Sequence, residues 1–309
     1  MKANRSRGFK AGFAWFAFAT GLLAPGILRA EVGVAIEPGG TVPATTYILN
    51  GLTEDPGPIN PVWRKLGTEE VARVSLNVAG EANGDGMPSL LSNPATGLIV
   101  AAWARNSVSG FDVVVSRFVS GAWTAPQVVV GSTASELDPQ LVLDPGGAVH
   151  LFYWVDSALP QVFHVEAPAD LSSWSTPLRV SENTEPSCRP AGAYYNGVLR
   201  VAYEVHNFGV GHAPREIVIA RLDNGAFTPE VVAVTNNLGP LHPEAHSHGG
   251  KFWVDWVDAE DNAGAGELAW ARLNAQAEWE PIQYEPFGNY EQREHLVRGA
   301  ARMHAIELP

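Results

Sequence analysis

One short segment gathers three histidines and a glutamate at alternate positions: residues 241–249 read LHPEAHSHG. Alternate side chains of a β-strand point to the same face, so His242, Glu244 and His246 are expected to lie together, with His248 at the turn that follows. Imidazole nitrogens and carboxylate oxygens bind divalent metals, and a metal-bound water acts as a nucleophile or base near neutral pH. The pattern indicates a divalent-metal site formed by His242, Glu244 and His246.

The alternative is a polar strand edge that binds a ligand directly or only hydrogen-bonds with itself. Alternate Cα atoms of a strand lie about 6.5 to 7 Å apart, which is wide for several of them to hold one ion. The spacing H-x-E-x-H also lacks the specificity of H-E-x-x-H on a helix. The sequence leaves the cofactor unknown beyond this divalent metal.

The elements that must position this segment recur along the chain. An aromatic residue with a proline two or three positions after it appears at Trp123, Trp174, Phe227 and Trp279, at intervals of 51, 53 and 52 residues. Upstream of each lies a proline that opens an alternating run, which we align at Pro88, Pro139, Pro186 and Pro243, and then an aromatic residue, which we align at Trp103, Trp154, Tyr203 and Trp256. Each unit contains four short alternating runs separated by turn residues, a pattern typical of a β-propeller.

The repeat predicts an all-β protein with a single β-propeller domain over residues 31–309. Complete blades one to four are expected at about 86–135, 136–184, 185–238 and 239–285. Residues 31–85 and 286–309 are expected to combine into a composite blade, so that a ring of five four-stranded blades is closed by both termini.

Residues 1–30 combine basic residues with a short apolar run and end in a small residue, which predicts a signal peptide cut after Ala30. We therefore expect a periplasmic or secreted protein, and no later run is long enough to span a bilayer. Removing this segment lowers the formal charge from -13 to about -18, which disfavours nucleic acid as a partner. The only cysteine, Cys188, excludes an intramolecular disulfide and is expected to be a buried small hydrophobic residue.

The repeated markers resemble those of the sialidase-like (BNR-type) propeller family. The shared features are a proline before an inner strand, a Gly-containing turn, an aromatic residue closing the next strand, and a W-x-x-P segment. The resemblance implies the propeller fold of exported bacterial proteins. It does not imply sialidase activity, because the turns SNPATGLIV, LDPGGAVHL, YYNGVLRVA and SHGGKFWVD each lack a complete Asp-box, S-x-D-x-G-x-x-W.

In a four-stranded meander, the start of the first strand and the end of the second lie on one face, around the mouth of the channel. The residues assigned there to catalysis are Glu185, Arg189, Glu244 and His246. The residues assigned to ligand binding are Asp138, Glu204, His206, Asp258 and His295. Five-bladed glycosidases of the arabinanase type place three carboxylates on successive inner strands, and Asp138, Glu185 and Glu244 resemble that arrangement.

Three functions fit these residues. The leading hypothesis is an exported propeller that recognises a carbohydrate or other small polar ligand at the mouth of blades three to five, where aromatic and carboxylate side chains suit hydroxyl-rich ligands. The second is a polysaccharide-active enzyme: a glycosidase needs two carboxyls about 5 to 9.5 Å apart, whereas a lyase needs a base such as His246 beside a cation such as Arg189. The third is a protein-interaction scaffold. The sequence leaves open whether the chain is an enzyme.

Overall fold

The structure is a computed structural model that describes most of the chain. The described residues are 32–36, 46–51, 61–66, 73–75, 86–93, 96–120, 122–182, 184–206, 214–234, 240–248, 250–259, 266–287, 292–298 and 301–307. They contain strands and turns but no helix, and hence no helix long and apolar enough to cross a membrane. The signal peptide expected at 1–30 lies outside them.

The strands form antiparallel sheets in chain order. The N-terminal sheet contains β1 (Val32–Ile36), β2 (Thr46–Gly51), β3 (Pro61–Leu66) and β4 (Arg73–Ser75). Blade one contains β5 (Gly86–Asn93), β6 (Leu98–Ser107), β7 (Gly110–Val119), β8 (Ala122–Trp123) and β9 (Gln127–Val130). It has five strands instead of the predicted four, because β8 and β9 both pair with β7. Blade two contains β10 (Ser135–Leu143), β11 (Val149–Asp156), β12 (Gln161–Ala167) and β13 (Leu178–Arg179).

The second half of the chain continues the same pattern. Blade three contains β14 (Ser187–Tyr195), β15 (Val198–His206), β16 (Pro214–Asp223) and β17 (Ala226–Val234). Blade four contains β18 (Pro240–His248), β19 (Lys251–Ala259), β20 (Gly266–Leu273) and β21 (Gln283–Phe287). A hairpin of β22 (Gln292–Arg298) and β23 (Ala301–Glu307) follows.

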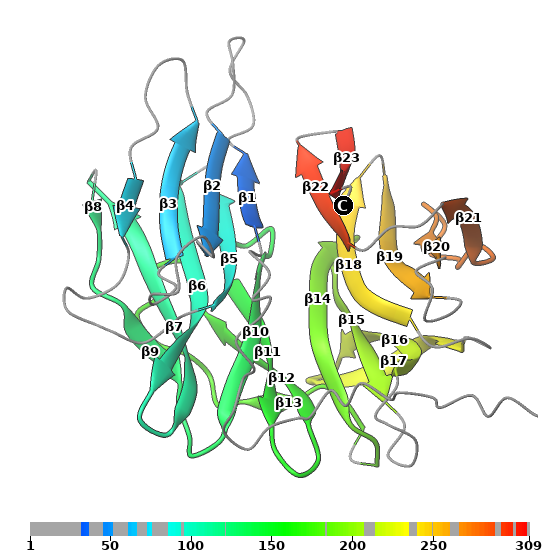
Figure 1. Ribbon diagram of the computed structural model, residues 1–309, viewed down its shortest axis with the longest axis horizontal. Coiled ribbons are helices and arrows are strands. Elements are labelled where there is room, and N and C mark those ends of the chain that lie inside the picture. Colours follow the sequence, from blue (N-terminus) through cyan, green and yellow to red (C-terminus); the bar gives the residue numbers. More distant parts are fainter. Residues whose placement is uncertain are drawn as a thin grey trace, which may run out of the picture.

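The first strand of each sheet is the inner one. Contacts link β1 to β5, β5 to β10, β10 to β14 and β14 to β18, and β22 contacts β1 (Figure 1). The structure does not form the composite blade that was expected from the two ends of the chain. The four strands of the N-terminal segment pair with one another, and β22 and β23 form a separate sheet. Strands adjacent in sequence pair most readily, and four consecutive runs in the N-terminal segment satisfy each other.

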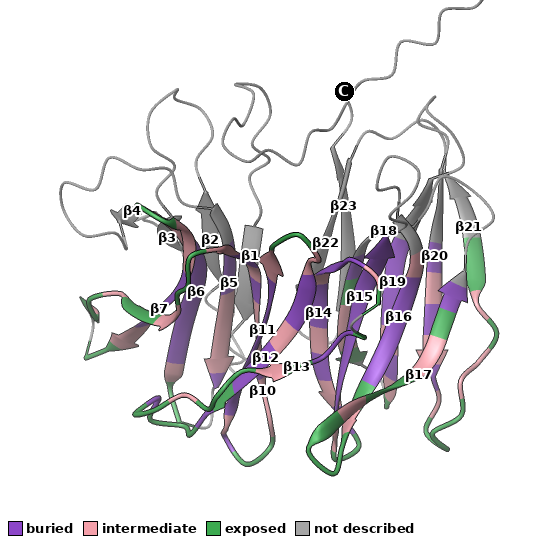
Figure 2. Ribbon diagram, turned by 90° about the horizontal axis from the view of Figure 1, so that it is seen from below, coloured by how far each residue is buried: buried purple, intermediate pink, exposed green. Residues whose placement is uncertain are grey.

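The core lies between the blades. Figure 2 shows burial concentrated along the middle of the strands and exposure in the turns. The repeated second-strand aromatics Trp103, Tyr153, Tyr203 and Trp256 are all essentially buried. The blade-two member was predicted as Trp154, but strand register assigns that place to Tyr153 and aligns Trp154 with Glu204 of blade three.

Each of the four inner strands from β5 to β18 carries a β-bulge at a residue followed by proline. The register shifts fall at Met87-Pro88, Asp138-Pro139, Arg189-Pro190 and His242-Pro243. Proline has no backbone N–H to donate to the ladder, so it fits where pairing is interrupted. The blade-three marker is therefore Pro190 rather than the predicted Pro186, which moves Arg189 into the position of Asp138 and leaves Glu185 just before β14.

Candidate functional site

Asp138 and Arg189 occupy the bulges of adjacent inner strands with an uncommon backbone conformation. Their φ angles are 49° and 51°, in the left-handed region that costs a residue with a Cβ about 1 to 2 kcal/mol. Both side chains consequently leave the regular strand alternation and reach the end of the second strand of their own blade. The same backbone conformation in two neighbouring blades brings the Asp138 carboxyl and the Arg189 guanidinium close enough to interact electrostatically.

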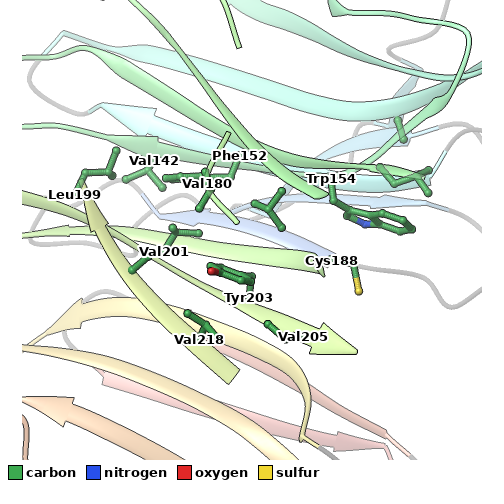
Figure 3. Close-up of a cluster of buried hydrophobic side chains, with 14 residues drawn as sticks. Val142, Phe152, Trp154, Val180, Cys188, Leu199, Val201, Tyr203, Val205 and Val218 are labelled. Atoms are coloured by element: carbon green, nitrogen blue, oxygen red, sulfur yellow. The ribbon is translucent and has the colours of Figure 1, made fainter. Parts of the chain in front are cut away.

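The two bulge residues make equivalent pairs within their blades. In blade two, Trp154 Nε1 donates to Asp138 Oδ2 at 2.5 Å. In blade three, Arg189 Nη1 donates to both carboxylate oxygens of Glu204, at 3.3 and 3.4 Å. Figure 3 shows Trp154 and Cys188 at one end of the packed cluster between these blades, so the pairs lie at the edge of a rigid interface.

Glu204 is the buried centre of the blade-three group. Its side chain is 0% exposed, whereas that of Arg189 is 38% exposed. Its Oε2 lies 2.9 Å from His206 Nε2, and Cys188 Sγ lies 3.1 Å from the same nitrogen. Arg189 is thus the member that a ligand can reach, and it is held by Glu204, which in turn contacts His206.

The charges of the group shift the pKa values of its members. Burial raises the pKa of Asp138, and nearby Glu204 adds to this effect while Arg189 and Trp154 oppose it. Burial lowers the pKa of Arg189, but the effects of Glu204, Cys188 and Asp138 together outweigh it, so the pKa lies above its ordinary value. Burial, followed by Glu204, raises the pKa of Cys188, so this residue is a protonated thiol.

The contacts of His206 limit what this group does chemically. Cys188 and Glu204 both approach Nε2, whereas a nucleophile, base and acid in relay use the two opposite nitrogens of one imidazole. Ligand atoms of Cys188, Glu204 and His206 lie within 4.8 Å of one another, but Glu204 already pairs with the Arg189 guanidinium and the pKa of Cys188 is raised, so this group is better suited to holding Arg189 than a metal ion. Cys188 is buried, as predicted, but its contacts with Glu204 and His206 were not predicted, because these partners are distant along the chain.

Blade four holds a second group of predicted residues. His246 stacks on Trp253, with ring centroids 6.4 Å apart, and its Nδ1 lies 3.7 Å from Asp255 Oδ1. Glu244 is exposed and pairs in register with Asp255, which is fully buried. Asp255 was not predicted, although an acid within the apolar run FWVDWV was a signal.

The two groups face different ways. Val254 and Trp256 fill the interface with blade three, so the alternating Trp253 and Asp255 face away from it, and His246 faces away with them. The structure therefore joins Asp138, Arg189, Glu204 and His206, and separately Glu244 and His246. The main-chain oxygen of Glu185 accepts from Gln161 Nε2 at 2.8 Å.

The side chains of three predicted site residues lie outside the part of the structure that is described. His242, Asp258 and His295 lie in β18, β19 and β22, and only their backbone is described. The metal site predicted from His242, Glu244 and His246 therefore stays a prediction, and so do the ligand roles of Asp258 and His295.

Comparison with known proteins establishes the fold. No protein-family model and no curated protein matches the chain. It is similar to a solved Dyadobacter fermentans protein of unknown function, with 13% identity, a TM-score of 0.61, and 84% of this chain and 83% of that chain covered. It is similar to an ulvan lyase of polysaccharide lyase family 25, with 9% identity, a TM-score of 0.60, and coverages of 82% and 69%.

A Penicillium chrysogenum α-L-arabinanase is also similar, with 14% identity, a TM-score of 0.55, and 83% of this chain and 80% of that chain covered. At these identities the likeness shows a β-propeller and carries no activity with it. These similarities support a propeller but not the sialidase-like type of repeat, which stays a prediction.

Proposed function

We propose that this protein recognises a carbohydrate at a mouth formed by Asp138 and Arg189 on blades two and three. The observation that carries the proposal is the partly exposed Arg189 side chain, whose guanidinium is held by the wholly buried Glu204 carboxylate. A donor fixed before binding loses little side-chain entropy when a ligand arrives. A guanidinium donates and a carboxyl accepts, so the pair suits a ligand with adjacent hydroxyl or acidic groups.

A binding experiment tests this proposal directly. The mature protein is titrated with a panel of neutral and uronate-containing oligosaccharides by calorimetry, beside Arg189→Ala and a matched control, Arg221→Ala. Arg221 is also a partly exposed arginine paired with acids, Asp223 and Glu230, but it lies on the third strand of blade three. We expect Arg189→Ala to weaken binding at least tenfold and Arg221→Ala to leave it unchanged. Equal affinity of Arg189→Ala and the wild-type protein contradicts the proposal.

A specific observation favours one enzymatic alternative. Glu204 is fully buried and paired, so it does not reach a sugar, and a glycosidase using Asp138 with Glu204 is disfavoured. An accessible cation beside a carboxyl of raised pKa instead suits a lyase, in which Arg189 neutralises a uronate carboxylate. The similar structures include an ulvan lyase and an arabinanase, which supports testing both chemistries.

Product analysis separates binding from catalysis. The protein is incubated with uronate-containing and neutral polysaccharides, and both unsaturated sugars and new reducing ends are measured. Unsaturated products that disappear in Arg189→Ala establish the lyase, and reducing ends without unsaturation establish a hydrolase. Binding with neither product establishes the lectin-like role.

The proposal includes export and ring closure. The basic and apolar composition of residues 1–30 supports export, and the contact of β22 with β1 supports a ring whose two ends meet at these strands. N-terminal sequencing of the periplasmic or secreted protein tests the first point, with Glu31 expected as the first residue.

A further inference from the structure

Two buried histidines face each other on neighbouring strands of blade two, at the rim opposite to Asp138. His150 of β11 and His164 of β12 are 5% and 3% exposed. His150 Nδ1 lies 3.0 Å from His164 Nε2, and the rings stack with centroids 5.2 Å apart. Burying two imidazoles requires polar partners for their nitrogens.

Two acids complete the surroundings of this pair. Glu166 Oε2 lies 3.6 Å from His150 Nδ1, and Asp144 Oδ2 lies 3.9 Å from His150 Nε2. The other oxygen of Asp144 accepts the Ala148 N–H at 2.7 Å, which fixes the aspartate in the turn before β11. His150 Nε2 is buried and has no hydrogen-bond partner among the described residues.

The repeat does not require these residues. Strand register aligns Glu166 with Arg117, Arg221 and Arg272 of the other blades, and it aligns His150 with Val100, Arg200 and Trp253. In blades three and four the arginine pairs with an acid, Glu230 or Glu280, on the outer side of its blade. Blade two alone replaces this pairing with two histidines and a glutamate, so the cluster is a local addition to the scaffold.

We propose that His150 Nδ1, His164 Nε2 and the Glu166 carboxylate bind a divalent transition metal such as Zn²⁺. The three ligand atoms lie within 4.8 Å of one another, and donors of a tetrahedral zinc site at 2.0 to 2.1 Å from the metal are about 3.4 Å apart, so small shifts bring them onto one ion. Imidazole ligands favour zinc over magnesium or calcium. Asp144 faces His150 Nε2 and favours a proton there, which leaves the Nδ1 lone pair for the metal.

The ion would brace the structure rather than take part in sugar recognition. His164 also packs edge-on against Phe227 of blade three, with centroids 5.5 Å apart, so the site fastens β11 to β12 at a blade interface. His150 lies four residues before Trp154 on β11, which is about 13 Å along a strand. The proposed metal site and the proposed carbohydrate site at Asp138 are therefore separate, and an experiment can refute either proposal without affecting the other.

Metal titration tests the site. The mature protein is stripped with a chelator, dialysed and titrated with Zn²⁺ alone by calorimetry, and Co²⁺ absorption reports the coordination geometry. Glu166→Arg restores the residue of the other blades and is expected to fold, and Glu166→Gln keeps the size of the side chain. His246→Gln is the matched control, because it alters the histidine site predicted in blade four.

We expect the wild-type protein to bind about one equivalent of Zn²⁺ with a raised unfolding temperature. Glu166→Gln should weaken the affinity for Zn²⁺ at least tenfold, and Glu166→Arg should abolish zinc binding. His246→Gln should leave both the zinc affinity and the stoichiometry unchanged. Absence of zinc binding by the wild-type protein overturns the proposal. Loss of binding in His246→Gln, with binding retained in Glu166→Arg, overturns it in favour of the blade-four histidines.

Discussion

The contact between blades two and three at Gly192 predicts a sharp response to one added methyl group. A Cβ at Gly192 would lie 2.5 Å from Phe152 Cε2, 2.7 Å from Phe152 Cδ2 and 3.0 Å from Val142 Cγ2. Phe152 is fully buried and packs on His164 and Phe227, so its ring has no room to retreat. Gly192→Ala is therefore expected to overpack this interface.

The size of the effect follows from two opposing terms. Overpacking a dense core costs about 1 to 3 kcal/mol. Alanine returns about 0.5 to 1 kcal/mol, because glycine loses more backbone freedom on folding and Gly192 has no positive φ to preserve. The contact at 2.5 Å places the overpacking cost in the upper half of its range, so we expect Gly192→Ala to lower the free energy of unfolding by about 1 to 2.5 kcal/mol.

Denaturant unfolding measures this change, with the m-value checked for constancy. Gly146→Ala is the control, because that glycine is exposed and its added Cβ meets only the Asp144 carboxylate, at 3.3 Å, a milder contact than the one at Gly192. Combining Gly192→Ala with Phe152→Leu, which removes the ring edge, should cost less than the sum of the two single changes. A stability of Gly192→Ala equal to or above that of the wild-type protein refutes the packing argument, as does strict additivity.

Three further predictions test polar groups. Burial raises the pKa of Glu136 above 4.5, so the ionised side chain destabilises the folded state. Glu136→Gln should therefore raise the urea midpoint of unfolding at pH 7, and this gain should shrink as the pH falls through the raised pKa. Equal midpoints of the two proteins at pH 7 would show the reasoning to be wrong. Tyr195→Phe removes a hydroxyl that donates to the Gly250 carbonyl across blades three and four, and should cost about 1 kcal/mol in thermal unfolding. Trp154→Phe removes the indole donor that lowers the pKa of Asp138, so an NMR titration should show that pKa rising, and an unchanged value would contradict the described hydrogen bond.

The sequence predicted an all-β fold of repeated antiparallel sheets because the markers of each repeat are local. Turn residues and alternating runs depend on neighbours within about ten residues, and these defined the meanders of blades one to four. The alignment failed where two candidates stood close together. Pro186 and Pro190 both fit the marker, and Tyr153 and Trp154 both fit the aromatic, and only cross-strand register chooses between them.

The candidate site was predictable in part. Arg189, Glu204 and His206 were placed at one mouth, since inner-strand starts and second-strand ends share a face, and the structure brings them into contact. The polar contacts of Cys188 and Asp255 were missed because they come from partners 16 or more residues away or on another strand. His150 and His164 show no pattern in one dimension, because the hairpin alone makes them neighbours.

The proline bulges have a consequence for how such a molecule diversifies. The ladder is already interrupted at each of these positions, so the residue before the proline is released from the demands of sheet pairing. Methionine, aspartate, arginine and histidine fill the four places at Met87, Asp138, Arg189 and His242. Each of these four blades thus has one position at which the side chain can vary without disturbing strand pairing. A single substitution there changes the chemistry of the surface around the inner strands, while the interfaces between blades keep their packing.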